Sequence, residues 1–230
     1  MESIVTVVGS CTLKRSPRRT LSISVLPDET VEIVAPLQAA IPAIQKKIAK
    51  RSSWIRRQRR FFSTLRIERS ERRFCSGATH KYLGRQYRLK ITTREISGVK
   101  LFGAYLNIFS CSRSERTVAQ LLSGWIKARA REQFEKRLKK WRQWCAALKL
   151  PNPTLHLRDM PKRWGSAHLN GRIYLNPELV RAPSICIDYV IAHEICHLKH
   201  PKHDKAFYAE LEKLFPRWRE TKLKLERADS

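Results

Sequence analysis

The first third of the chain alternates hydrophobic and polar residues in a way that is typical of strands. Apolar side chains occupy every second position in residues 21–25 and 31–35, and Pro27-Asp28-Glu29 separates the two runs. This predicts a β-hairpin with one buried face. Over residues 41–62 the apolar positions take helical spacing, and the opposite face is rich in Lys and Arg, so we expect an amphipathic basic helix there. Its apolar face consists of Ile44, Ile48, Ile55 and Phe62.

The rest of the chain continues this mixture of strand and helix patterns. In chain order the pattern predicts strands within 80–109, a helix over about 117–149, strands at 154–158 and 172–175, and helices at 184–199, 204–214 and after Pro216. We expect Ser184 to cap the helix at 184–199. The mixture favours the α+β fold class.

Composition and charge indicate the compartment in which the protein is expected. The 230 residues include 47 Lys and Arg against 20 Asp and Glu, which gives a net charge of +27. Six scattered cysteines without a CxxC pair are typical of a reducing compartment. The first eight residues lack the features of a signal peptide, and no apolar run reaches the ~20 residues of a membrane span. We therefore expect a soluble, cytoplasmic protein without a membrane partner.

The charge is concentrated in the segment 46–73, which holds twelve Lys or Arg against Glu68 and Glu71. Trp54 and the pair Phe61-Phe62 lie among these basic residues. Basic and aromatic side chains together can bind phosphates and stack on bases, so the segment is a candidate contact for nucleic acid or another polyanion. The alternative is a solvated helix face whose aromatic side chains pack inward.

The run His193-Glu194-Ile195-Cys196-His197 carries the strongest chemical signal. Its two histidines lie four residues apart on a predicted helix, so both side chains project from one face and can share a metal ion. Imidazole nitrogens suit Zn²⁺. Glu194 lies one step round the helix, where it can take a proton from a zinc-activated water without binding the metal. This indicates a zinc-dependent hydrolase with Glu194 as its acid/base.

A catalytic zinc site needs a third protein ligand. His203 follows Pro201, where the chain has turned and can bring a side chain back to the pair, so it is our first candidate. Glu210 on the following helix is the second. His200 is expected to point elsewhere, because it lies only three residues beyond His197 on the same helix. His156 and His168 are weaker candidates.

Several of these runs together resemble the YgjP-like family of metallopeptidases, which is related to SprT-like and other gluzincin-type proteases. The resemblance rests on four runs: residues 163–166 (RWGS), residues 173–176 (IYLN), residues 187–198 around the histidine pair, and residues 203–207 (HDKAF). It implies a zincin-like core with one zinc ion held by His193, His197 and His203, and Glu194 as the catalytic residue. Ala167 departs from the family pattern, which has cysteine at this position.

These features lead to one principal hypothesis about function. We expect a zinc metallopeptidase that cleaves peptide or protein substrates, with Trp164, Gly165 and Ser166 as possible substrate-binding residues. Residues 1–112 are expected to form a β-rich basic region, and residues 113–230 the hydrolase core. Two alternatives remain open at this point: a metal-dependent nucleotide or phosphoanhydride hydrolase, and a zinc protease recruited by nucleic acid.

Overall fold

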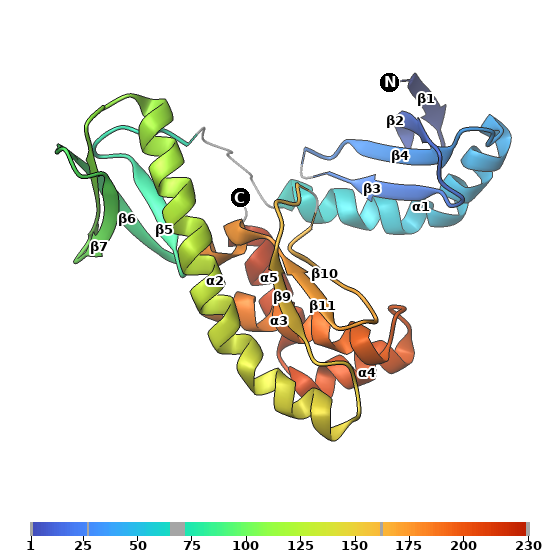
Figure 1. Cartoon of the computed structure of the whole chain (residues 1–230). Coiled ribbons are helices and arrows are strands. Elements are labelled where there is room, and N and C mark those ends of the chain that lie inside the picture. Colours follow the sequence, from blue (N-terminus) through green and yellow to red (C-terminus); the bar gives the residue numbers. More distant parts are fainter. Residues whose placement is uncertain (1, 27, 65–71, 162, 229–230) are drawn as a thin grey trace. The chain divides into compact units, whose positions relative to one another are not determined.

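The computed structural model describes residues 2–26, 28–64, 72–161 and 163–228, and of residues 61, 62, 64 and 228 it describes only the backbone. The described residues fall into two compact units, one within residues 1–70 and one within residues 71–229. Figure 1 shows the elements of both. The expected α+β class is confirmed, because each unit combines helices with small sheets.

The amino-terminal unit is a four-stranded sheet with one helix. Strands β3 and β4 form the antiparallel hairpin predicted from the sequence, with Ile23 opposite Ile33. The predicted apolar face of α1 is buried at Ile44, Ile48 and Ile55, whereas the side chain of Phe62 lies outside the described residues. The strand order is β1-β2-β4-β3, and the elements are β1 (Glu2–Thr6), β2 (Gly9–Ser16), β3 (Ser22–Val25), β4 (Val31–Pro36) and α1 (Ile41–Thr64).

The second unit begins with another four-stranded sheet, which packs on a long helix. The sheet has the order β5-β6-β8-β7. Its core-facing side carries Leu89, Leu106 and Ile108, which are 0–2% exposed. On the same side Tyr82 meets Trp125 of α2 edge-on, with ring centroids 5.0 Å apart. The elements are β5 (Thr79–Tyr82), β6 (Arg85–Thr93), β7 (Gly98–Phe102), β8 (Tyr105–Ser110) and α2 (Glu115–Ala147).

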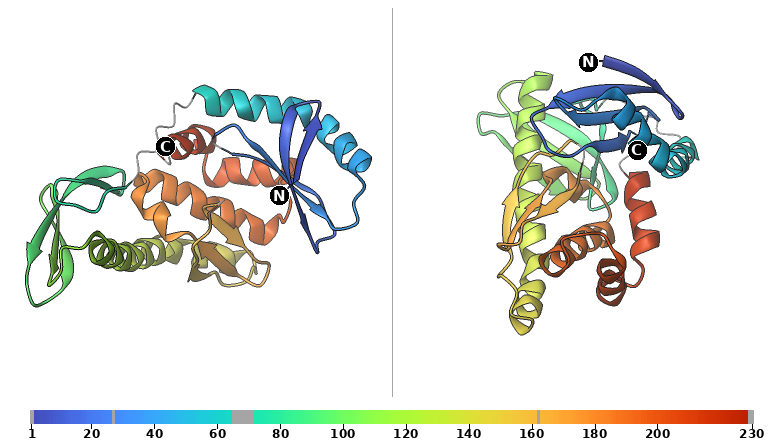
Figure 2. Two further views of the ribbon diagram at one scale, coloured as in Figure 1. Left: turned by 90° about the horizontal axis from the view of Figure 1, so that it is seen from above. Right: turned by 90° about the vertical axis from the view of Figure 1, so that its right-hand side faces the viewer.

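The remaining elements build a small sheet and a group of helices around α3. The sheet has the order β10-β11-β9, so β10 is an edge strand. Helix α3 packs against α2, α4 and α5 (Figure 2). The elements are β9 (Thr154–Leu157), β10 (Gly165–Ala167), β11 (Arg172–Leu175), the short 3₁₀ helix η1 (Pro177–Arg181), α3 (Ser184–Lys199), α4 (Lys205–Leu214) and α5 (Trp218–Ala228).

The units do not coincide with the division expected at residues 112 and 113. One continuous hydrophobic core runs from Tyr82 in the β5–β8 sheet, through α2 and α3, to Leu225 in α5. The boundary between the two compact units therefore lies near residue 70. The expected division remains a prediction about where the catalytic region begins.

The start of α3 differs from the arrangement expected from the sequence. The sequence led us to expect Ser184 as the cap of α3. In the structure Pro183 occupies the N-cap position and makes no side-chain capping bond, which corrects that expectation. Pro183 lies instead against Gly84, where an added Cβ atom would come within 2.8 Å of the Cα of Pro183.

Among the described residues, no helix combines the length and the apolar character that crossing a bilayer requires.

Candidate metal centre

Helix α3 places His193 and His197 on the same side, one turn apart. Their ring centroids are 5.0 Å apart. The helix is held by apolar side chains that are almost fully buried, among them Ile187, Ile191 and Ile195. The backbone N–H of His200 closes the last turn by donating to the carbonyl of Cys196 at 2.8 Å. The pair thus projects from a helix end whose position is fixed by the core.

The chain turns after Pro201 and brings His203 back to this pair. Asp204 is the N-cap of α4, and its carboxylate accepts the backbone N–H of Phe207 at 3.0 Å. This cap fixes the residue next to His203. The Nε2 atom of His203 lies 3.0 Å from Nε2 of His193, and its ring centroid is 4.5 Å from that of His197. One possible ligand atom from each histidine lies within 4.8 Å of the others.

The protonation of these rings suits a metal ligand. Nδ1 of His197 lies 3.1 Å from the backbone oxygen of His200. A carbonyl only accepts hydrogen bonds, so this Nδ1 carries the proton and leaves the lone pair on Nε2. Burial lowers the pKa of His193 to about 3, and it also lowers the pKa values of His197 and His203. All three imidazoles are therefore neutral at pH 7.

Phe207 of α4 packs against the rings of all three histidines. It is fully buried, and its ring centroid lies 4.6–5.0 Å from the ring centroids of all three. A side chain that touches every member of the triad limits how far any of them can rotate. The triad is consequently held in place by packing against Phe207 and by the N-cap of α4 next to His203.

Glu194 lies beside the triad, between α3 and β10. Its side chain is 6% exposed, and burial raises the pKa of its carboxyl group to about 8. The guanidinium of Arg163 and a hydrogen bond from the backbone N–H of Ala167 oppose that rise. A Cβ atom at Gly165 would lie 2.7 Å from Oε1 of Glu194. Glycine is thus required at position 165 if the carboxylate is to keep this position.

The residues present fit a zinc ion. Zinc binds imidazole nitrogen at about 2.0–2.1 Å, so tetrahedral ligands stand roughly 3.3–3.4 Å from one another. The Nε2 atoms of His193 and His203 lie 3.0 Å apart, and one possible ligand atom from each of the three histidines lies within 4.8 Å of the others, so the three are close to this spacing. Three neutral nitrogen ligands leave one coordination position open, as a catalytic site needs. In the part of the chain that the structure describes, no other group of three His, Cys, Asp or Glu side chains converges in this way.

The other candidates from the sequence lie outside the triad. Glu210, the second choice for the third ligand, pairs with Lys199 at 3.0 Å. The ring of His200 lies 3.9 Å from the same carboxylate. His156 and His168 both pack on Tyr174, with ring centroids 5.0 and 5.3 Å apart. The structure thus brings His203 to the pair and leaves these side chains elsewhere.

Trp164, Gly165 and Ser166 lie at the start of β10 or just before it. The backbone N–H of Asn176 donates to the carbonyl of Trp164, and the N–H of His168 donates to that of Arg172. Antiparallel hydrogen-bonded pairs alternate along a strand, so residues 165 and 167 turn their backbone groups away from β11. The N–H of Ala167 reaches Glu194, which agrees with this alternation. The edge of β10 that does not pair with β11 therefore lies beside Glu194.

Sequence reasoning missed three supporting groups: the cap at Asp204, the carbonyl of His200 and the N–H of Ala167. The first had a readable signal, because Asp immediately before a helical pattern is a common N-cap. The other two are backbone atoms. Their roles depend on where the chain lies in space, and no side-chain pattern reveals them.

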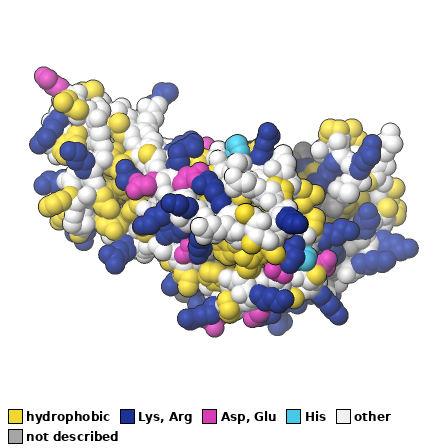
Figure 3. All heavy atoms as spheres, turned by 60° about the horizontal axis from the view of Figure 1, so that its bottom comes forward, with side chains coloured by type: hydrophobic (Ala, Val, Ile, Leu, Met, Phe, Trp, Pro, Cys, Tyr) yellow, Lys and Arg dark blue, Asp and Glu magenta, His cyan; other side chains and the backbone are white. Residues whose placement is uncertain are grey.

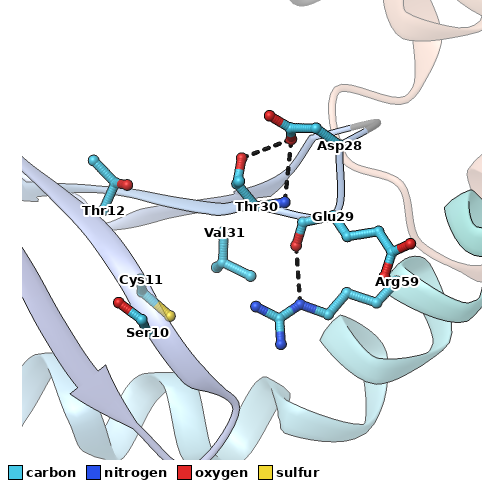
Figure 4. Close-up of a pocket in the computed structure, with 8 residues that line it drawn as sticks. All are labelled: Ser10, Cys11, Thr12, Asp28, Glu29, Thr30, Val31 and Arg59. Atoms are coloured by element: carbon cyan, nitrogen blue, oxygen red, sulfur yellow. Dashed lines mark hydrogen bonds between the residues drawn. The ribbon is translucent and has the colours of Figure 1, made fainter. Parts of the chain in front are cut away.

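A separate pocket lies in the amino-terminal unit (Figure 4). It has a volume of about 410 Å³ and is lined by residues of β2 and β4, the turn before β4, and Arg59 of α1. The guanidinium of Arg59 already donates to the backbone oxygens of Glu29 and Val8. Asp28 accepts from the amide and the hydroxyl of Thr30. These polar groups hold the unit together, and we assign them no chemistry.

The fold and the triad together define a protein of the zincin-like metallopeptidase fold. A family model described as "YgjP-like, metallopeptidase domain" matches residues 19–228, and the chain belongs to this family. The resemblance drawn from the sequence is thereby confirmed.

Two further comparisons accompany the family match. Among solved structures the chain is similar to the crystal structure of the metallopeptidase zymogen of Pyrococcus abyssi abylysin. The sequence identity is 24% and the TM-score 0.34, over 38% of this chain and 87% of that one. At this level the likeness carries no argument of its own. No curated protein matches the chain.

Proposed function

We propose that the protein is a zinc metallopeptidase in which His193, His197 and His203 hold one zinc ion. The observation that carries the proposal is the convergence of the three histidine nitrogens within 4.8 Å beside the buried carboxylate of Glu194. Three neutral imidazoles with an open fourth position are typical of a catalytic rather than a structural zinc site.

In the proposed mechanism Glu194 moves the proton. A zinc ion held by His193, His197 and His203 would supply a Lewis acid that lowers the pKa of water toward ~7 and polarises the scissile carbonyl. Glu194, in the ionised form that a nearby metal ion would favour, takes a proton from the attacking water as the new carbon–oxygen bond forms. It then gives that proton to the amide nitrogen as the carbon–nitrogen bond breaks, so the residue ends in its original state. The contacts with Gly165 and Ala167 keep the carboxylate on the side of the triad that faces β10.

The edge of β10 offers a place for the substrate. Gly165 and Ala167 turn backbone groups away from β11, and among the described residues neither carbonyl group accepts a backbone hydrogen bond, so both can pair with an extended peptide. Adding a strand to this edge would satisfy them by main-chain hydrogen bonds. It would also bring the peptide backbone past Glu194. This supports an extended peptide segment as the substrate, with Trp164 and Ser166 as neighbours of its side chains.

Neither alternative gains a specific observation. Phosphoanhydride hydrolysis usually uses carboxylate-rich or paired metal sites, and the described residues offer a histidine triad instead. Recruitment by nucleic acid through segment 46–73 would involve residues 65–71 and the side chains of Phe61 and Phe62. These lie outside the part of the chain that the structure describes. We retain residues 113–230 as the proposed catalytic region, because the triad, Glu194 and β10 all lie within it.

The test compares zinc content and hydrolysis in matched variants. Glu194→Gln should keep about one zinc per chain and lose at least ~10²-fold in hydrolysis of peptides or unfolded proteins, because the group that transfers the proton is gone. His203→Ala should lower zinc affinity by more than about 100-fold, since it removes a direct ligand. Metal content by mass spectrometry and turnover by fluorogenic peptides measure the two effects.

The controls are Glu132→Gln, an exposed acid of α2, and His200→Ala, which keeps the backbone carbonyl that binds His197. Both should retain zinc and activity. Full activity in Glu194→Gln would disprove the mechanism. Zinc binding unaffected by His203→Ala would disprove the ligand set. Hydrolysis of nucleoside triphosphates in place of peptides would favour the phosphoanhydride alternative.

A further inference from the structure

The β5–β8 sheet has a second side, which faces away from α2 and which we call the outer sheet face. The core-facing residues of β6 and β8, such as Leu89 and Leu106, are buried, and the residues between them project to the opposite side. The outer sheet face carries three basic and three aromatic side chains: Arg88, Lys90, Lys100, Phe102, Tyr105 and Phe109.

The strand register arranges these side chains in rows. Arg88 of β6 lies beside Tyr105 of β8, which in turn lies beside Phe102 of β7. Lys90 and Lys100 flank Asn107 in the next row. Residues paired across neighbouring strands project to the same side of a sheet, with Cβ atoms about 4.5–5.5 Å apart. Basic and aromatic groups therefore lie in neighbouring rows on a single surface.

The aromatic rings on this surface are accessible. Phe102 is 81% exposed and Tyr105 is 46% exposed. The guanidinium of Arg94 lies 4.6 Å from the ring centroid of Phe109, so the face of that ring already receives a planar cation. Leaving a phenylalanine this exposed forgoes the roughly 1.5–3 kcal/mol that its burial would contribute. Such rings are candidates for contact with a partner.

The charge of the region limits what that partner can be. Residues 79–110 contain six Lys or Arg and a single acidic residue, Glu95, which lies in the turn between β6 and β7. Figure 3, in which this sheet lies at the left, shows basic side chains next to hydrophobic ones there. A surface of this kind attracts a polyanion. The exposed aromatic rings among these Lys and Arg side chains favour a polyanion that also presents flat apolar faces.

We propose that the outer sheet face binds single-stranded nucleic acid, with Phe102 and Tyr105 stacking on bases and Arg88, Lys90 and Lys100 contacting phosphates. Unpaired bases expose the planar faces that such rings can stack on, whereas the bases of a duplex are stacked on one another. Sheets with aromatic residues on one face are known to bind single strands in this manner; here Tyr105 lies on the inner strand β8 and Phe102 on the edge strand β7. The proposal concerns a surface distinct from the metal centre and does not rest on the proposed peptidase activity.

The test measures binding of the full chain to a fluorescent 20-nucleotide oligothymidylate by anisotropy, at several salt concentrations. Phe102→Leu with Tyr105→Leu keeps apolar bulk and removes both flat rings, and should weaken binding at least about tenfold. Lys90→Gln with Lys100→Gln should reduce the slope of log affinity against log salt by about 1.4, because each phosphate contact to a single strand contributes about 0.7.

Matched probes and variants separate this surface from general attraction to the basic chain. Lys136→Gln with Lys139→Gln makes the same charge change at exposed positions of α2, outside both the sheet and segment 46–73. It should reduce the slope of log affinity against log salt by much less than the substitutions of Lys90 and Lys100 do. A duplex of the same length should bind equally to the wild type and to the ring variant. Vesicles of phosphatidylserine and phosphatidylcholine test an anionic membrane as the partner.

Several outcomes would overturn the proposal. These are an absence of oligothymidylate binding by the wild type, equal affinity of the ring variant and the wild type, and an equal loss for the single strand and the duplex. Loss of vesicle binding in the ring variant, with oligonucleotide binding intact, would assign the surface to a membrane instead. Because all the altered side chains are exposed, thermal unfolding should remain unchanged, which confirms that the variants are folded.

Discussion

The metal centre and the outer sheet face belong to the same compact unit and share one hydrophobic core, yet they are built in opposite ways. In the centre, each side chain is held by a named neighbour: His197 by the carbonyl of His200, the triad by Phe207, and Glu194 by β10. On the outer sheet face, side chains such as Phe102 project from a regular register with little around them.

This difference suits the two roles that we propose for these regions. Moving a proton beside a metal ion requires atoms positioned to within a fraction of an ångström, so buried support is needed around every group. Contact with a flexible polyanion tolerates mobile side chains, because phosphates and bases can adjust to them. The centre should therefore be sensitive to small changes in packing, and the outer sheet face should be insensitive to them. The predictions below test that contrast.

The largest expected effect is on stability, from two phenylalanines of opposite exposure. Phe207→Ala should lower the free energy of unfolding by about 3–5 kcal/mol, because it empties a fully buried site beneath the triad. Phe102→Ala should change it by less than about 0.5 kcal/mol, since the ring is 81% exposed. Urea unfolding of the two variants measures the contrast. Equal costs would show that the sheet ring is packed, contrary to its exposure.

The next effect concerns activity, from two glycines. Gly165→Ala should reduce kcat/KM by about 10²-fold with zinc retained, because the new methyl group displaces the Glu194 carboxylate and no ligand is touched. Gly124→Ala in α2 meets nothing within 4 Å. It should leave activity unchanged and stabilise the helix by about 0.5–1 kcal/mol. If Gly165→Ala were fully active, β10 would not fix the position of the carboxylate.

The smallest effect comes from the cap beside the third histidine. Asp204→Ala removes the bond to the N–H of Phe207 and should cost about 1 kcal/mol. The melting temperature should fall by roughly 2–4 °C. Zinc affinity should fall with it, because His203 loses its fixed neighbour, whereas Asp204→Asn keeps an accepting oxygen and should preserve both properties. Calorimetry and zinc titration provide the measurements. An Ala variant indistinguishable from Asn would mean that His203 is placed without the cap.

The hydrophobic periodicity of the sequence predicted most of the helices and several of the strands. The hairpin of β3 and β4, the helix α1, the long helix α2 and the helix α3 all lie within a few residues of their expected bounds. Strands β1 and β2 were not anticipated from the sequence, and β10 (residues 165–167) was not among the strands that the periodicity predicted. A strand of three residues is too short to display a period. Its assignment depends on pairing with β11, which lies several residues further along the chain.

The sequence by itself determined the chemistry that is possible at the metal centre. The spacing of His193 and His197 places them on one helical face, because the helix repeats every 3.6 residues, and Pro201 requires a turn before His203. Local rules of this kind act over a few residues and can be read from the chain.

Only the tertiary structure decided which distant groups complete that centre and which surface lies beside it. The structure brings His203, the first candidate from the sequence, to within 3.0 Å of His193, and it pairs Glu210 with Lys199. The closeness of Gly165 to Glu194, and the rows formed by Arg88, Tyr105 and Phe102, arise from contacts between separate elements. Such contacts depend on register and packing across the core, where residues remote in sequence become neighbours.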